Sequence, residues 1–236
     1  MLTPKRIYVE ELLDAGEGTD DDVARNLSDL RRINRFLGGT KVVLNALESF
    51  ARNGQVKQLS LLDVGTGSAD IPTAVVEWCK ERGINAMVSA LDLSERNLRI
   101  ARTRLGINRE IELVRADSLN LPFRAHSFDF VTASLFLHHF RDDDVVRLLS
   151  DFARVARRAI IVNDLVRNLI PYYFTRLTGP ILATSFLTRN DGPVSVLRGF
   201  TAAELKGLSK RAGLQKFDVK RSFPYRLSLV AQAGDQ

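Results

Sequence analysis

One short stretch constrains the fold of this chain more than any other. Residues 59–64, Leu-Ser-Leu-Leu-Asp-Val, are an apolar run, and they are followed at once by Gly65 and Gly67. The run predicts a buried strand, and the two glycines predict a tight turn that needs a positive φ or a close backbone approach. A helix is expected next, with Asp70 as its cap and Pro72 in its first turn.

This unit of strand, glycine turn and helix indicates a type of binding site. It leaves backbone N–H groups open at a helix N-terminus, and nucleotide-like ligands bind at that position in doubly wound sheets. A glycine pair also occurs in ordinary tight turns between a strand and a helix, so the pair alone is not specific. The sequence downstream has to decide between a ligand-binding turn and an ordinary tight turn.

Predicted strands and helices alternate downstream. Further strands are predicted at residues 86–93, 111–116, 128–134 and 159–164, and helices at 71–82, 94–105 and 142–158. Such an alternation predicts a parallel sheet covered by helices on both faces. Two last strands, 216–221 and 227–231, are expected as an antiparallel pair at the sheet edge. The expected fold is α/β, a Rossmann-like doubly wound sheet of seven strands, mostly parallel with an antiparallel last strand.

Two segments lie outside this alternation. Residues 1–54 begin with a loose or partly helical arm and continue with helical periodicity at 20–37 and 40–53, which predicts an N-terminal helical cap ahead of the sheet domain, residues 55–236. Residues 165–200 contain three prolines and are much longer than an ordinary connection. We expect them to form a lid insertion after the fifth strand.

Composition excludes several classes of protein. With 236 residues and 45% hydrophobic content, the chain can bury a full α/β core. No apolar run is long enough to span a bilayer and no apolar signal region follows the first charges, so a cytoplasmic protein without a membrane span is expected. The single cysteine, Cys79, lies in an apolar helical pattern and is expected in the core. The net charge of +6 is spread along the chain, which disfavours a nucleic-acid partner.

Three acidic residues lie at the predicted carboxyl ends of successive strands, namely Asp63, Asp92 and Asp117. In an open parallel sheet these ends line the ligand crevice. A carboxylate after the second strand can accept two hydrogen bonds from ribose hydroxyls, and one after the third strand is well placed for the amino group of adenine. Each acid could instead cap the helix that follows it, but their occurrence at three consecutive strand ends favours an adenosine-containing ligand.

Four stretches together resemble the sequential motifs of class I S-adenosylmethionine-dependent methyltransferases. They are Leu-Leu-Asp-Val-Gly-Thr-Gly at 61–67, Leu-Asp-Leu-Ser at 91–94, Arg-Ala-Asp-Ser-Leu-Asn-Leu-Pro-Phe at 115–123 and Ser-Phe-Asp-Phe-Val-Thr-Ala-Ser at 127–134. The chain is most similar to the small-molecule type related to the quinone-biosynthesis C-methyltransferases, over about residues 55–165. Ala69 departs from the pattern, because a third glycine often stands there. A nicotinamide dehydrogenase shares the first acid and the turn, but it has no role for the Asp117 motif.

The resemblance implies S-adenosylmethionine as the cofactor and a set of positions that hold it. In that family the glycine turn holds the methionine portion, the second acid the ribose and the third acid the adenine. Arg32 and Arg35 could close over the cofactor's carboxylate from the N-terminal helix, or they could be surface arginines. Carried over to this chain, the other positions are Asp63, Gly65, Thr66, Gly67, Asp92, Leu93, Asp117, Ser118 and Ser134.

Candidate acceptor residues follow the fourth strand and lie in the expected lid. His138 and His139 are located where the transfer site of the resembled family lies, and we expect one of them to accept or orient the acceptor's proton. In an extended backbone their side chains would point to opposite sides. A histidine that only bonds the backbone is the alternative. The lid residues Tyr172, Tyr173, Arg176 and Arg198 suit an aromatic or acidic acceptor, and they equally suit helix packing with a solvated basic face.

The expected function is therefore methyl transfer from S-adenosylmethionine to a small aromatic or polyketide-like acceptor. O-methylation is favoured over C-methylation of a quinone-type ring. An RNA methyltransferase and a catalytically silent cofactor-binding protein are the alternatives from other classes, and a monomer or a homodimer is expected. No metal site is expected, because no Cys/His cluster has zinc spacing and the acidic run at 142–144 suits a helix start.

Overall fold

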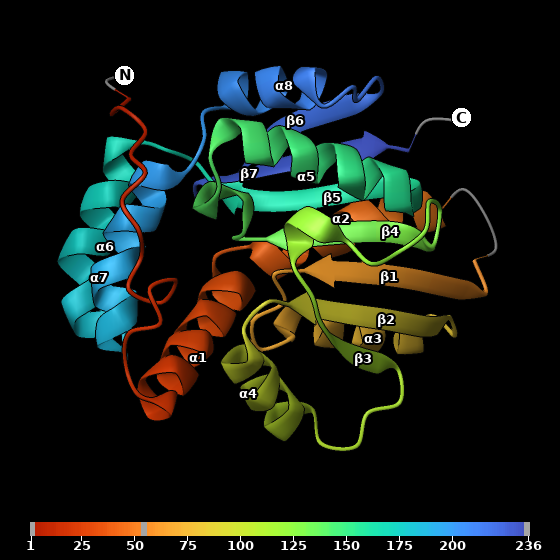
Figure 1. Ribbon diagram of the computed structural model, residues 1–236, viewed down its shortest axis with the longest axis horizontal. Coiled ribbons are helices and arrows are strands. Elements are labelled where there is room, and N and C mark those ends of the chain that lie inside the picture. Colours follow the sequence, from red (N-terminus) through yellow and green to blue (C-terminus); the bar gives the residue numbers. More distant parts are fainter. Residues whose placement is uncertain (1–2, 53–55, 234–236) are drawn as a thin grey trace.

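The computed structural model describes residues 3–52 and 56–233 (Figure 1). Within these residues one sheet of seven strands has the order β3-β2-β1-β4-β5-β7-β6. Strands β1 to β5 pair in parallel, and β7 is antiparallel to both of its neighbours. The predicted Rossmann-like fold is confirmed. The strands are β1 (Gln58–Val64), β2 (Asn85–Asp92), β3 (Ile111–Arg115), β4 (Phe128–Ser134), β5 (Ala156–Leu165), β6 (Phe217–Ser222) and β7 (Arg226–Gln232).

Helices cover both faces of this sheet (Figure 1). One core packs α2 (Gly39–Ala51) and α3 (Asp70–Glu81) against the sheet and includes the buried Cys79, as predicted. A second core packs α5 (Asp142–Val155) and α8 (Ala202–Arg211) against the other face. Helix α4 (Glu95–Leu105) packs beside β2 and β3. No helix in the described part of the chain is long and apolar enough to cross a membrane.

A third layer of helices lies beyond the carboxyl ends of the parallel strands (Figure 1). It consists of α1 (Asp20–Phe36), α6 (Leu169–Leu182) and α7 (Phe186–Arg198), so the expected lid forms a pair of helices. The buried carboxylate of Asp29 in α1 accepts the backbone N–H groups of Thr184 (2.8 Å) and Ser185 (3.0 Å) at the start of α7. The N-terminal helix and the lid helices therefore form one layer.

The N-terminal arm, residues 3–19, runs along α7 without a helix or strand and turns at residues 12–16 (Figure 1). Ile7 N–H donates to the carbonyl of Leu197, and the carboxylate of Asp191 accepts the N–H groups of Leu12 and Leu13 at 2.9 and 3.1 Å. The arm is thus fixed to the lid helices, and it brings two carboxylates to the strand ends.

Two local predictions are wrong. Asp70 does not cap α3, because Ala69 is the N-cap in a left-handed conformation (φ 56°), and the Asp70 carboxylate instead accepts Asn34 Nδ2 at 3.0 Å. The helix predicted to end at 158 ends at Val155. Arg157 and Arg158 already belong to β5, where their guanidinium groups lie 3.7 and 3.6 Å from the carboxylate of Asp129.

Candidate active site at the carboxyl ends of the strands

The turn after β1 contains two glycines in the left-handed backbone conformation. Gly65 and Gly67 have φ values of 71° and 53°. The N–H groups of Gly65 and Thr66 both donate to the carbonyl of Leu91 at the end of β2, at 2.9 Å. A Cβ atom on Gly65 would lie 2.1 Å from the ring of Phe136. Gly65 is therefore required both by its backbone conformation and by the lack of space.

The acid at the end of β2 is fixed against this turn. Asp92 Oδ2 accepts the N–H of Gly67 at 2.8 Å, and Oδ1 accepts the N–H of Ser94 at 2.9 Å. Burial raises the pKa of Asp92, against these hydrogen bonds and the charge of His139. Asn97 Nδ2 makes only long contacts with Oδ1 and Oδ2, at 3.4 and 3.5 Å, and the hydroxyl groups of a ribose diol could replace them.

The next strand end carries Asp117 and Ser118, on the same edge. Asp117 Oδ1 accepts Leu119 N–H at 2.9 Å, and Oδ2 accepts Asn120 Nδ2 at 2.8 Å, so this carboxylate caps the short helix η1 (Ser118–Asn120). Leu93 has 64% of its surface exposed beside β2, which leaves an apolar side chain free to pack against a flat ring.

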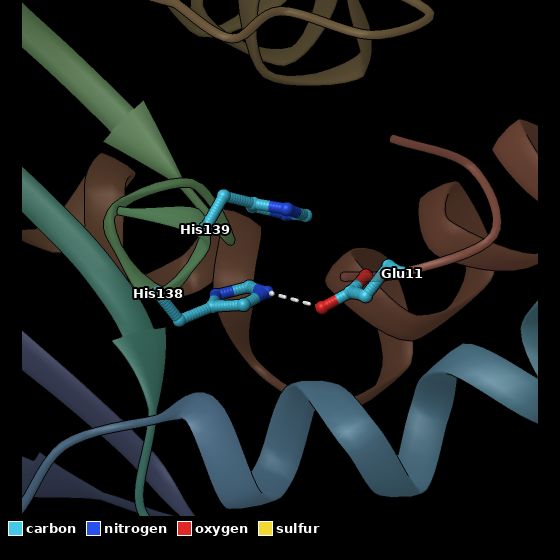
Figure 2. A group of neighbouring side chains, drawn as sticks. All are labelled: Glu11, His138 and His139. Carbon is cyan, nitrogen blue, oxygen red and sulfur yellow. Dashed lines mark ion pairs between the residues drawn. The ribbon is translucent and has the colours of Figure 1, made fainter. Parts of the chain in front are cut away.

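His138 lies in η2 (Leu137–His139), the short helix that follows β4, and it is buried. Its Nδ1 lies 2.7 Å from Asp164 Oδ1, and its backbone N–H donates to Asp164 Oδ2 at 3.2 Å. Its Nε2 lies 3.6 Å from Oε1 of Glu11 in the N-terminal arm (Figure 2). Both ring nitrogens of His138 therefore face carboxylates.

His139 lies beside it, with 20% of its side chain exposed against 3% for His138. The expectation of opposite orientations is wrong, because η2 is helical and the two ring centroids lie 4.3 Å apart (Figure 2). His139 Nδ1 lies 2.7 Å from Asp14 Oδ2. Burial alone lowers the pKa of His139, but the Asp14 hydrogen bond and the charges of Glu11 and Asp14 outweigh it and raise the pKa.

Comparison with known proteins shows which proteins this chain is similar to. Residues 62–160 match the family profile described as a methyltransferase domain. The demethylmenaquinone methyltransferase of Bacillus cytotoxicus is 26% identical over 212 residues, 80% of this chain and 87% of that protein. A methyltransferase structure from Aquifex aeolicus, described as dependent on S-adenosylmethionine, aligns with a TM-score of 0.63 at 18% identity, over 92% of this chain and all of that one. Human N-acetylserotonin methyltransferase, solved with S-adenosylmethionine, aligns at 0.67 and 15% identity, over 98% and 63%.

Residues 62–160 of this chain form a methyltransferase domain, and the chain is similar over most of its length to known methyltransferases in sequence and in fold. The predicted family, enzyme class and cofactor are thereby confirmed. The residues of the edge fit the cofactor, because the glycine turn leaves no room for a side chain on Gly65, and the carboxylate of Asp92 beside the turn has only long contacts with Asn97 to give up to a ribose. The individual cofactor positions stay predictions.

Arg32 and Arg35, which were predicted to close over the cofactor, lie on α1, and α1 packs against the glycine turn. Leu27 of α1 lies 3.3 Å from the position of a Cβ atom on Gly67. Arg32 is paired with Asp29, and the guanidinium of Arg35 lies 5.7 Å from the ring centroid of Phe36. Arg32 also lies 3.5 Å from the carbonyl of Leu182 at the end of α6, and a contact of either arginine with the cofactor stays a prediction.

Arg198 is the one predicted lid residue that the structure brings to the histidines of the methyltransferase. It is buried, and its guanidinium donates to the backbone carbonyls of His138 (3.1 Å), His139 (2.6 Å) and Val9 (2.9 Å). These bonds connect α7, η2 and the N-terminal arm. Arg198 therefore positions the histidines through their backbone.

The other lid candidates lie on α6. Arg176 Nη1 lies 3.4 Å from the hydroxyl of Tyr172, the rings of Tyr172 and Tyr173 lie edge to face at 5.1 Å, and Tyr173 is exposed. At the end of β4, Ser134 Oγ accepts Asn163 Nδ2 at 3.1 Å. A role of these residues in substrate or cofactor binding stays a prediction.

Sequence reasoning missed three contributors to the site. Arg104 of α4 donates to the carbonyls of Ser68 (2.8 Å) and Ala69 (2.7 Å) and so supports the turn. Glu11 and Asp14 reach the histidines from the arm, which lies more than a hundred residues away in sequence. No local pattern marks these two acids, because neither lies in a predicted element.

Asp63 gives the methyltransferase a stability that depends on pH. It is buried and accepts Thr132 Oγ1 at 2.7 Å, and burial raises its pKa from 3.8 to about 7. Between these values the folded protein holds a proton that the unfolded chain has lost, so the free energy of unfolding falls as the pH rises. Across this window wild type should lose on the order of 4 kcal/mol relative to Asp63→Asn.

Urea unfolding at pH 5 and pH 8 tests this expectation. The fall in the free energy of unfolding should be smaller in Asp63→Asn than in wild type by the contribution of Asp63, whereas the exposed Glu112→Gln should show the same fall as wild type. The same fall in Asp63→Asn as in wild type would contradict the assignment to Asp63.

Proposed function

We propose that the methyltransferase methylates a small aromatic acceptor that bears an ionisable hydroxyl, and that His139 accepts the proton of this hydroxyl. The observation that carries the proposal is the contact of 2.7 Å between His139 Nδ1 and Asp14. A carboxylate on Nδ1 favours the tautomer whose Nε2 is a free acceptor, and it stabilises the imidazolium that forms.

His139 suits this role better than His138. Of the two ring nitrogens of His139, only Nδ1 has a hydrogen-bond partner among the described residues, and the ring is partly exposed. His138 is buried between Asp164 and Glu11, so we assign it a positioning role.

The reaction needs alignment and removal of one proton. Bound S-adenosylmethionine supplies a methyl group on a sulfonium, which is transferred by an in-line displacement. The acceptor forms the new bond to this methyl carbon as the bond from carbon to sulfur breaks. His139 Nε2 takes the acceptor's proton, Asp14 holds Nδ1–H, and Arg198 keeps both histidines in place through their carbonyls.

O-methylation follows directly, because the deprotonated oxygen is the nucleophile. C-methylation of a quinone-type ring is the second candidate, and the name of the relative from Bacillus cytotoxicus, demethylmenaquinone methyltransferase, favours it. The reduced form of a quinone carries phenolic hydroxyls, and loss of one proton raises the nucleophilicity of the ring carbons. The same base therefore serves both reactions.

A labelled-methyl assay tests the proposal. The protein is incubated with S-adenosylmethionine carrying a labelled methyl group and with naphthols, reduced naphthoquinones or catechols. Matched controls carry methoxy groups in place of every hydroxyl, and a bulk tRNA sample serves as the nucleic-acid arm. Label should enter only the hydroxylated rings, and mass spectrometry of the product separates O- from C-methylation. Equal transfer to the methoxy analogues, or transfer to tRNA alone, would overturn the proposal.

A further inference from the structure

Three side chains from two distant parts of the chain converge beside the site. Glu11 comes from the N-terminal arm, and His138 and His139 come from η2 (Figure 2). One potential ligand atom of each lies within 4.8 Å of the other two. We infer that Glu11, His138 and His139 bind one divalent transition-metal ion of the Zn²⁺ class through two imidazole nitrogens and one carboxylate oxygen.

The neighbours of these side chains favour metal binding. Asp164 and Asp14 lie 2.7 Å from Nδ1 of His138 and His139, respectively. Carboxylates in this position orient the ring and make the other nitrogen a better ligand, as around histidines that bind zinc. The carboxylate of Glu11 is itself held, because Ser195 Oγ donates to its Oε1 at 2.8 Å.

The charges around the cluster are unbalanced when both histidines are neutral. Glu11, Asp14 and Asp164 contribute three negative charges, whereas Arg198 is the one lysine or arginine within ion-pair distance of these acids in the described part of the chain. One divalent cation would neutralise the remainder. Charge in so buried a place needs a partner, and a metal ion bound by all three groups supplies it.

The distances require only a small closure. Bonds from Zn²⁺ to nitrogen or oxygen are about 2.0–2.2 Å long, so neighbouring ligands of a tetrahedral ion lie roughly 3.4 Å apart. His138 Nε2 and Glu11 Oε1 are already 3.6 Å apart. His139 is the exposed member of the three, so the ion can enter past its ring and keep a water molecule as its fourth ligand.

Metal binding has a consequence for catalysis. A bound ion occupies the lone pair of His139 Nε2, and this nitrogen can then no longer accept a proton. Occupancy of the cluster should therefore inhibit methyl transfer, and a chelator should restore it. The inhibition rests on the proposed function, whereas the binding itself does not.

Calorimetric titration with zinc chloride, after treatment of the full chain with a chelator, tests the site. One ion should bind per chain, and Co²⁺ in its place should give the visible absorption of a cobalt ion with nitrogen ligands. Glu11→Gln, which preserves size, and His139→Ala should each weaken binding by about 10–100-fold or more. His126→Ala changes the exposed third histidine and should leave binding unchanged. Circular dichroism of each variant shows whether it has folded.

The outcomes separate the two proposals. No binding of Zn²⁺ by folded wild type, or unchanged affinity in both Glu11→Gln and His139→Ala, overturns the metal site and leaves the role of His139 as a base unaffected. Binding that depends on these residues but does not inhibit methyl transfer supports the metal site and overturns the base. Inhibition that follows occupancy supports both.

Discussion

Replacing His139 by alanine should lower kcat by about 10²- to 10⁴-fold, the range typical for loss of a general base. The ring has its Nδ1 on Asp14 and is the more exposed of the two histidines. The affinity for S-adenosylmethionine should change little, because neither the glycine turn nor Asp92 forms a hydrogen bond with this ring. Single-turnover kinetics in the presence of a chelator, with cofactor binding measured by calorimetry, separates the two quantities.

Two further variants make this test specific. Asp14→Asn keeps the size of the side chain but removes the charge that supports the imidazolium, so it should lower kcat as well, by a smaller factor. His126→Ala should be as active as wild type, because His126 lies on the surface at the opposite end of β4. Added imidazole should partly restore His139→Ala. Wild-type turnover by His139→Ala with every hydroxylated acceptor would rule out His139 as the general base.

Gly65→Ala should abolish measurable cofactor binding and destabilise the fold. The left-handed conformation costs about 1–2 kcal/mol for a residue with a Cβ atom, and overpacking costs about 1–3 kcal/mol more. The new methyl group would meet the ring of Phe136 at 2.1 Å. Either the ring or the turn has to move, and a movement of the turn would displace Asp92, which accepts the N–H of Gly67.

A double-mutant cycle and a matched glycine separate strain from collision. Phe136→Ala in the Gly65→Ala background should recover part of the lost stability, because it removes the collision but not the strained φ. Gly83→Ala has a similar φ of 66° and open space around its Cβ position, so its loss of stability measures strain alone. Equal losses of stability in Gly65→Ala and Gly83→Ala, with no recovery in the double mutant, would contradict a collision between the new methyl group and Phe136.

The sheet and its glycine turn could be predicted because their signals are local. Strand β4 was predicted with its observed bounds, residues 128–134, since an apolar run between turn residues fixes both ends. The three acids lie at strand ends because the alternation of strands and helices determines which edge they share. The capping role given to Asp70 failed because tertiary contacts, a hydrogen bond from Asn34 among them, override local preference.

The site around the histidines could not be predicted in the same way. Its partners, Glu11 and Asp14, belong to an arm without periodicity, and the arm is fixed by single hydrogen bonds such as that from Leu12 N–H to Asp191. Their position depends on the packing of α7, which brings residues separated by more than a hundred positions into contact. The stacked histidines likewise depend on one helical turn in place of an extended backbone.

The N-terminal arm and the sheet contribute different groups to the candidate site. The predicted cofactor positions along the sheet edge all follow residue 58, whereas Asp14 and Glu11, which lie beside the histidines, come from the arm. A protease that cuts within the arm would separate the two sets of groups. We expect such a cleaved protein to keep its affinity for S-adenosylmethionine, whereas His139 would lose Asp14 and His138 would lose Glu11 but keep Asp164. Binding of the donor and its use would then depend on different parts of the chain.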